Sequence, residues 1–249
     1  MSSRGVPPPP PPIAGRALLV SNDSTVVGQL TSGMQQFAIT ADVCPDLATA
    51  ASLISTRKFE AIVVDLALGE QVAHVLERIR LSPSSQNSVT FALVDSCART
   101  ESRVQPSFIM QKPLTDSLVG STLKAALGLI LRDYRRYFRC PVAVPVAIQI
   151  NSTAKIPCEM MNISEGGLAV NALVTFKPGA LVRIQFTLPD EPTTLDIAAE
   201  ICWCDNQGRA GLHFRSVSPE QKLLLQGWLS HRIEQGLPEP VARLFQKAQ

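Results

Sequence analysis

The stretch RDYRRYFRCPVAVPVAIQI, residues 132–150, contains the change of pattern that decides the fold. Its first residues end an amphipathic stretch with helical spacing. From Cys140 onward every second residue is apolar, namely Val142, Val144, Val146, Ile148 and Ile150. A period of two is typical of a half-buried strand, whereas a helix repeats its apolar residues at three and four positions. We therefore predict that one domain ends here and a different one begins. Four arginines stand at this joint: Arg132, Arg135, Arg136 and Arg139.

Length and composition limit what such a chain can do. Its 249 residues fit two domains of ordinary size, with 45% hydrophobic and 18% charged residues. The net charge of +2 and an aromatic content of 5% argue against binding of polymeric nucleic acid. No apolar run reaches the length of a membrane span, and the N-terminus lacks a signal-peptide core. We expect a cytoplasmic protein.

The reactive side chains form no catalytic or metal-binding pattern. The six cysteines have no metal-ligand spacing and are expected to be reduced, and the three histidines are isolated. There is no nucleophile–base pair and no dinucleotide or ATP loop. We therefore expect no enzyme activity, no metal and no cofactor.

The first half of the chain predicts an α/β domain. Residues 1–15 include six consecutive prolines and are expected to be a disordered leader. In residues 16–133, short apolar runs such as AIVVD and VTFALV alternate with stretches of helical spacing. Strands with continuous apolar runs, separated by helices, indicate a parallel sheet covered on both faces.

The second half, residues 134–236, predicts an antiparallel β-barrel with a C-terminal helix. Alternating strands are separated by turn segments such as SEGG, KPG and DNQG, with no helix between them. Pro145 is expected at an edge or a bulge because it lacks an N–H group. The segment SPEQKLLLQGWLSHRIEQG predicts a closing helix that ends at Gly236, and residues 237–249 form a tail.

Two short motifs in the second half have the chemistry to bind a nucleotide. An arginine fork matches phosphate oxygens and the O6 and N7 acceptors of guanine, so Arg135 and Arg139 are candidate ligands. Downstream, NISEGGLAV offers Asn162 and Ser164 as hydrogen-bonding groups, while Gly166 and Gly167 permit close backbone approach and a positive φ. Each motif also has a purely structural interpretation, as a solvated helix end and as an ordinary turn.

Taken together, the motifs resemble the PilZ domain, a bacterial receptor module for cyclic di-GMP. RxxxR, NxSxxG, the strand pair AEICWC and GRAGLHF, and the final helix follow one another in that family's order. The resemblance implies that Arg135 and Arg139 hold guanine and phosphate, with Arg136 assisting. It also implies that Asn162 and Ser164 contact base and phosphate and that Gly167 provides clearance.

Residues 16–133 are similar to a response-regulator receiver domain with a flavodoxin-like parallel sheet. Asp65 ends the strand EAIVVD, where receivers carry the phosphoacceptor, and Lys112 precedes Pro113 as in the Lys-Pro of receivers. Receivers hold Mg²⁺ with acidic residues after the first strand, but here Ser21 and Asn22 take those positions. We therefore predict a pseudo-receiver in which Asp65 and Lys112 form an ion pair.

The function expected from both resemblances is a signalling effector. Cyclic di-GMP would clamp the joint between the domains and alter domain orientation or the docking of a protein partner through the receiver-like domain. Two alternatives stay open: a regulator controlled by phosphorylation of Asp65, and a degenerate PilZ module that has lost its ligand. Whether one or two ligand molecules bind, and whether the protein forms a homodimer, is left open by the sequence.

Overall fold

The computed structural model describes residues 14–69, 71–95, 106–150 and 155–246. The chain divides into two compact units, one made of Met1–Tyr134 with Glu234–Gln249 and the other of Arg135–Ile233. The predicted proline-rich leader lies almost entirely outside the described residues. Within the described ranges, no helix is long and apolar enough to cross a membrane.

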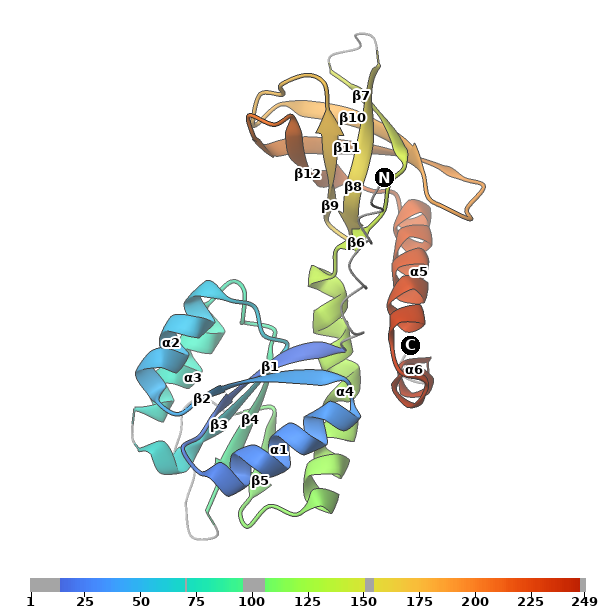
Figure 1. Ribbon diagram of the computed structural model, residues 1–249. Helices are drawn as coiled ribbons and strands as arrows, with labels where there is room; N and C mark the ends of the chain where they lie inside the picture. Colours follow the sequence, from blue (N-terminus) through green and yellow to red (C-terminus); the bar gives the residue numbers. More distant parts are fainter. Residues whose placement is uncertain (1–13, 70, 96–105, 151–154, 247–249) are drawn as a thin grey trace, which may run out of the picture. The chain divides into compact units, whose positions relative to one another are not determined.

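The first unit contains a five-stranded parallel sheet (Figure 1). Its strands are β1 (Gly15–Val20), β2 (Ile39–Cys44), β3 (Ala61–Asp65), β4 (Val89–Val94) and β5 (Phe108–Gln111). The strand order is β2-β1-β3-β4-β5, the doubly wound order of flavodoxin-like and receiver-like domains. The predicted fold class of this half is therefore confirmed. All five residues of β3 are buried, because helices cover both faces of the sheet.

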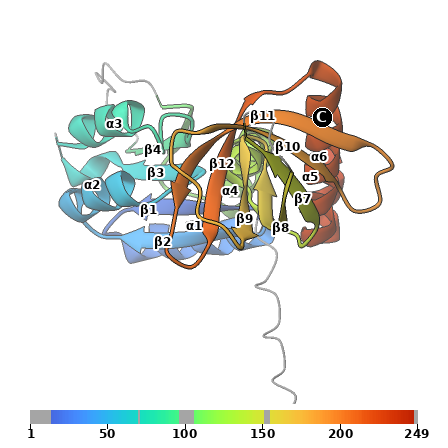
Figure 2. The same cartoon turned by 90° about the horizontal axis from the view of Figure 1, so that it is seen from above.

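Helices cover the sheet on both sides (Figures 1 and 2). They are α1 (Ser24–Gln36), α2 (Leu47–Thr56), the short 3₁₀ helix η1 (Leu66–Leu68), α3 (Val72–Leu81) and α4 (Asp116–Tyr137). Helices α2 and α3 share one core with β1 and β3, in which Ile54 and Ile79 pack with Leu18 and Ile62. Helices α1 and α4 approach closely at Gly33. A Cβ at this position would lie 2.5 Å from a methyl group of Val119, so the approach depends on glycine.

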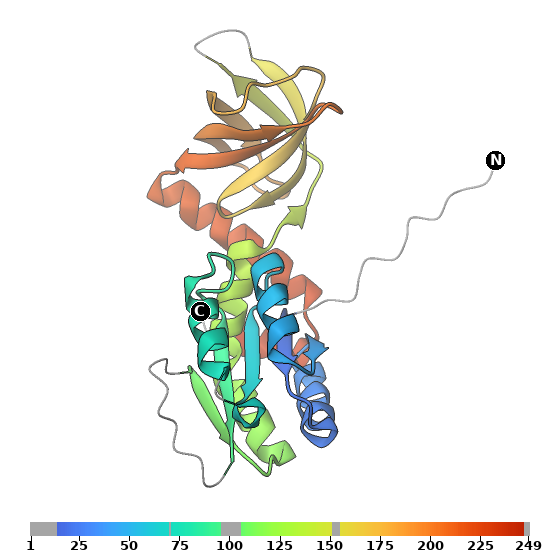
Figure 3. The same cartoon turned by 90° about the vertical axis from the view of Figure 1, so that its left-hand side faces the viewer.

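The second unit is a closed antiparallel barrel (Figure 3). Its strands are β6 (Cys140–Pro141), β7 (Pro145–Gln149), β8 (Ile156–Ser164), β9 (Gly167–Ala172), β10 (Leu181–Thr187), β11 (Thr194–Cys204) and β12 (Arg209–Ser216). The sheet order is β6-β8-β7-β10-β11-β12-β9, and the additional pairing of β8 with β9 closes a barrel of six strands. The predicted barrel is confirmed. The expected edge or bulge at Pro145 is wrong, because β7 pairs with both β8 and β10. Pro145 is instead the first residue of its strand, a position where its missing N–H is tolerated.

Helix α5 (Pro219–Gly236) follows the barrel and ends at the predicted glycine. Its residues Leu225, Trp228 and Leu229 belong to the barrel's hydrophobic core. The Trp228 indole N–H donates to the carbonyl of Pro189 at 2.9 Å, so this buried polar atom has a partner. Residues 237–249, expected to be a tail, include a further helix, α6 (Glu239–Gln246).

Candidate functional site

Asp65, at the carboxyl end of β3, is a buried carboxylate surrounded by donors from the protein itself. Its Oδ2 accepts a hydrogen bond from the Ser21 hydroxyl at 2.9 Å. Its Oδ1 accepts from Lys112 Nζ at 3.0 Å and from the Ala67 N–H at 3.1 Å. The ion pair expected between Asp65 and Lys112 is therefore present, and its ammonium already balances the charge of the carboxylate.

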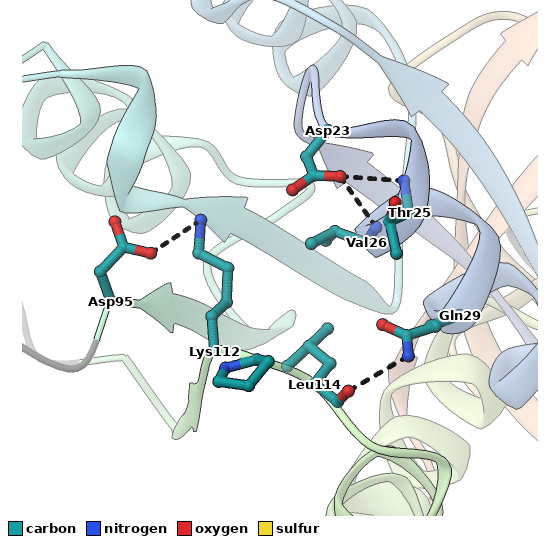
Figure 4. A pocket seen from close by; sticks show the side chains of 8 residues that line it. Asp23, Thr25, Val26, Gln29, Asp95, Lys112 and Leu114 are labelled. Carbon is teal, nitrogen blue, oxygen red and sulfur yellow. Dashed lines mark hydrogen bonds and ion pairs between the residues drawn. The ribbon is translucent and has the colours of Figure 1, made fainter.

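Lys112 also contacts a second carboxylate. Its Nζ lies 3.2 Å from Asp95 Oδ1, on the loop after β4 (Figure 4). Partial burial alone would lower the pKa of this ammonium, but hydrogen bonds to Asp65 and Asp95 raise the pKa above its ordinary value. Lys112 therefore stays charged and remains bound between the two carboxylates.

These residues do not fit the magnesium site of a receiver. Mg²⁺ requires oxygen ligands, usually carboxylates. Ser21 uses its hydroxyl to donate to Asp65. Asp23 accepts hydrogen bonds from the N–H groups of Thr25 and Val26 as the N-cap of α1 (Figure 4). Lys112 also lines the neighbouring cavity of about 490 Å³. This chemistry gives no support to phosphoryl transfer to Asp65.

We expect phosphodonors to leave Asp65 unmodified, because a metal is needed to offset the charge that develops during phosphoryl transfer. Incubation with acetyl phosphate and Mg²⁺ should leave the intact mass of the protein unchanged. A phosphoryl adduct that forms on the wild type and is absent from Asp65→Asn would contradict this prediction.

The second unit has a cavity of about 350 Å³ on the surface of the barrel. It is lined by the end of α4, the β8–β9 turn and strands β9, β11 and β12. The polar, charged and aromatic lining residues are Arg136, Arg139, Ser164, Cys202, Trp203 and His213. The volume lies at the lower end of the range found for small-molecule sites.

Arg136 and Arg139 are exposed cations in this cavity. Arg136 lies in the last turn of α4, and Arg139 follows two residues after the helix ends at Tyr137. In the part of the chain that the structure describes, neither guanidinium forms an ion pair. The cavity therefore has two positive charges that a ligand anion can neutralise.

The predicted binding residues do not all reach this cavity. Arg136, Arg139, Ser164 and Gly167 line it, whereas Arg135 and Asn162 do not. Asn162 lies on β8, where its Oδ1 is buried and accepts no hydrogen bond from any described residue.

Arg135 points toward another set of groups within the second unit. Its Nε lies 2.9 Å from Glu165 Oε1, and its guanidinium donates to the Ser230 hydroxyl of α5 at 3.5 Å. Glu165 also accepts a hydrogen bond from Gln226 Nε2 at 3.4 Å. Arg135 therefore has a carboxylate partner supplied by the NxSxxG segment itself.

The β8–β9 turn is formed by Ser164 and the two glycines. The Ser164 hydroxyl donates to the Gly167 carbonyl at 3.1 Å and is largely buried. A Cβ at Gly167 would lie 2.1 Å from the Leu212 carbonyl oxygen, so close packing of β9 on β12 requires glycine. The expectation of a positive φ at Gly166 and Gly167 is wrong: neither residue has one. Glycine serves backbone approach here, not a left-handed turn.

Three lining residues, Cys202, Trp203 and His213, were not predicted from the sequence. The ladder between β11 and β12 shifts register between Ile201 and Trp203, and both Cys202 and Trp203 are exposed. A bulge re-aims side chains, and this one brings the indole to the cavity. The indole lies over Gly211, where a Cβ would be 2.0 Å from Trp203 Nε1. The sequence signal that could have indicated the exposed indole is a tryptophan on one strand with a glycine opposite it on the next strand.

Comparison with known proteins identifies a family in the second half of the chain. Residues 133–231 match the family model described as PilZ domain. No curated protein matches the chain. Among solved structures, the Bacillus subtilis inhibitor of motility is 23% identical over 39% of this chain and 50% of that chain, with a TM-score of 0.34. The match therefore spans half the length of that protein.

Two further solved structures are each similar to part of the chain. The PilZ domain of CeSA from a cellulose synthesizing bacterium is 22% identical, covering 36% of this chain and 97% of that chain, with a TM-score of 0.31. The receiver domain of a sensor histidine kinase from Pseudomonas aeruginosa is 14% identical, covering 46% of this chain and 98% of that chain, with a TM-score of 0.42.

Proposed function

We propose that this chain, whose residues 133–231 form a PilZ domain, binds cyclic di-GMP and acts as a non-enzymatic signalling effector. The observation that carries the proposal is the barrel cavity, which combines two exposed arginines with an exposed tryptophan. Cyclic di-GMP has two phosphodiester anions and two guanine bases. Arginine forks suit both the phosphates and the guanine edge, and an indole provides a face for stacking.

Arg136 and Arg139 would supply the positive charge, and Trp203 would stack on a base. Ser164 and the backbone beside Gly167 would form the floor of the site, since both residues line the cavity. Direct contacts of Arg135 and Asn162 with the ligand would require rearrangement of side chains that do not line the cavity. No group in this set needs to donate or accept a proton, so the site fits binding without chemistry.

The proposed output is a change at the joint between the two units. Arg136 and Arg139 lie on either side of the end of α4, so a ligand that holds both would order this segment. Ligand can bias domain orientation only through different affinities for the alternative arrangements. The receiver-like unit would then present an altered surface to a protein partner in the cytoplasm.

Hydrogen exchange tests this output. Cyclic di-GMP should slow exchange of backbone amides in residues 132–142 as well as in the turn at 160–168. Solution scattering or paired spin labels should report a changed distance between the units. If only residues 160–168 gain protection and the distance stays the same, binding would stand but the clamp mechanism would be wrong.

Trp203 provides a direct optical signal for the site. It is 46% exposed, whereas the other tryptophan, Trp228, is 6% exposed in the core. Stacking of a base on an aromatic ring contributes about 1–3 kcal/mol. Cyclic di-GMP should therefore quench the fluorescence of Trp203, and Trp203→Ala should weaken binding roughly fivefold to a hundredfold. Unchanged fluorescence at saturating ligand would contradict the stacking contact.

A further inference from the structure

The position of Arg135 bears on the affinity for cyclic di-GMP, and the inference drawn from it rests on the proposed function. The family motif implies that this arginine contacts cyclic di-GMP, yet the structure pairs it with Glu165 at 2.9 Å. The pair is largely shielded from solvent, with side-chain exposures of 26% for Arg135 and 21% for Glu165. Arg135 Nε and Glu165 Oε1 are both buried atoms, so the carboxylate faces the guanidinium away from bulk water.

Glu165 sits beside the proposed nucleotide cavity but is not among the residues that line it. The next residue, Gly166, lines the proposed nucleotide cavity. Gly166 and Glu165 both line a second cavity of about 250 Å³. The turn therefore borders both cavities, and Glu165 lines only the one that is not the proposed nucleotide cavity. Gln226 and Ser230, four residues apart on α5, also contact the pair.

For Arg135 to bind a ligand phosphate, it must exchange one anion for another. Both contacts pair the guanidinium with an anionic oxygen, so the exchange itself yields little net stabilisation. After the exchange Glu165 would keep its charge in a partly buried position, with the 3.4 Å contact from Gln226 as its remaining described hydrogen bond. Burying a carboxylate without its cation is unfavourable, and the ligand phosphate would add a nearby like charge.

We propose that Glu165 is an internal competitor of cyclic di-GMP: it holds Arg135 outside the nucleotide cavity and thereby lowers the affinity for the ligand. The carboxylate takes the place of a ligand phosphate in the free protein. Binding transfers the guanidinium from Glu165 to the phosphate. This residue therefore sets the ligand concentration at which the effector responds.

Calorimetric titration of the full chain with cyclic di-GMP tests the proposal through a double-mutant cycle. Glu165→Gln keeps the shape and the contact with Gln226 but removes the charge, and it should tighten binding roughly tenfold. In an Arg135→Ala background, the same substitution should change affinity by less than about twofold. Glu159→Gln, an exposed residue of β8 that lines neither cavity, is the matched control and should have no effect.

The titrations can contradict the competitor role of Glu165 without contradicting the proposed function. If the wild type binds and Glu165→Gln binds equally well or more weakly, the competitor role is overturned and the function stands. Equal tightening in the Arg135→Ala background would also overturn it, because the effect would not pass through Arg135. If no variant binds cyclic di-GMP, the proposed function fails and the competitor role fails with it.

A measurement without ligand checks the pair itself. The Nε–H resonance of Arg135, observed by nitrogen-15 NMR of the free protein, should shift and exchange faster with water in Glu165→Gln than in the wild type. An unchanged resonance would mean that Glu165 does not hold the guanidinium in solution. That result would overturn the proposal whatever the titrations show.

Discussion

Arg139→Ala is expected to weaken cyclic di-GMP binding by roughly tenfold to more than a hundredfold while leaving the fold intact. The Arg139 guanidinium is exposed in the barrel cavity and has no ion-pair partner among the described residues, so its removal disturbs little else. A charge-assisted hydrogen bond to a desolvated anion contributes about 1.5–3 kcal/mol, and each 1.4 kcal/mol is about tenfold in affinity.

A matched variant distinguishes a site contact from the general effect of positive charge. Arg183 lies on β10 of the same barrel, is exposed and pairs with Asp196 at 2.6 Å, outside the cavity. Arg183→Ala removes the same charge and should change affinity by less than about twofold. Arg139→Lys should give an intermediate loss, because lysine keeps the charge but lacks the planar fork. Equal weakening by Arg183→Ala would argue against the assigned site.

Lys58→Met is expected to destabilise the first unit by roughly 3–5 kcal/mol, the range for removing one partner of a buried ion pair. The Lys58 ammonium pairs with Asp133, which is 3% exposed in the last turns of α4. Glu60, also buried, lies in the same group of charges. Burial raises the pKa of the Glu60 carboxyl, the nearby Lys58 ammonium opposes that rise, and the Asp133 carboxylate adds to it. Without Lys58, two buried carboxyl groups would face each other with less positive charge.

Thermal or urea unfolding of the first unit measures this loss. Arg57→Met is the control, because Arg57 is 56% exposed and its 3.4 Å contact with Asp42 is a surface ion pair. Such pairs contribute about 0–1 kcal/mol, so this variant should unfold close to the wild type. If Lys58→Met were no more destabilising than Arg57→Met, the buried pair would not anchor the end of α4.

Most elements of the parallel-sheet domain could be predicted from the sequence, but one edge strand and one largely polar helix could not. Strands such as β3 have continuous apolar runs because helices cover both faces. Strand β2, at the edge of the sheet, was missed because Thr40 and Asp42 interrupt its apolar pattern. Helix α1 was missed because most of its residues are polar, and only Val26, Leu30, Gly33 and Met34 are buried.

The candidate site could be predicted only where its residues belong to local motifs. Arg136 and Arg139 belong to one short stretch, Ser164 and Gly167 belong to another, and all four line one cavity. Trp203 and His213 come from strands farther along the chain, and a register shift that the sequence does not reveal exposes the indole. The pairing of Arg135 with Glu165 depends on how α4, the turn and α5 meet, which no local pattern encodes.

Binding of cyclic di-GMP is tested by calorimetric titration of the purified 249-residue chain. We expect saturable binding with a measurable heat. We also expect a higher unfolding temperature of the barrel unit when ligand is in excess, because a ligand that binds the folded state stabilises it. The titration should be repeated with GMP, which has the base but lacks the cyclic phosphodiester, and binding should be much weaker. No heat and no change in unfolding temperature at saturating cyclic di-GMP would contradict the account.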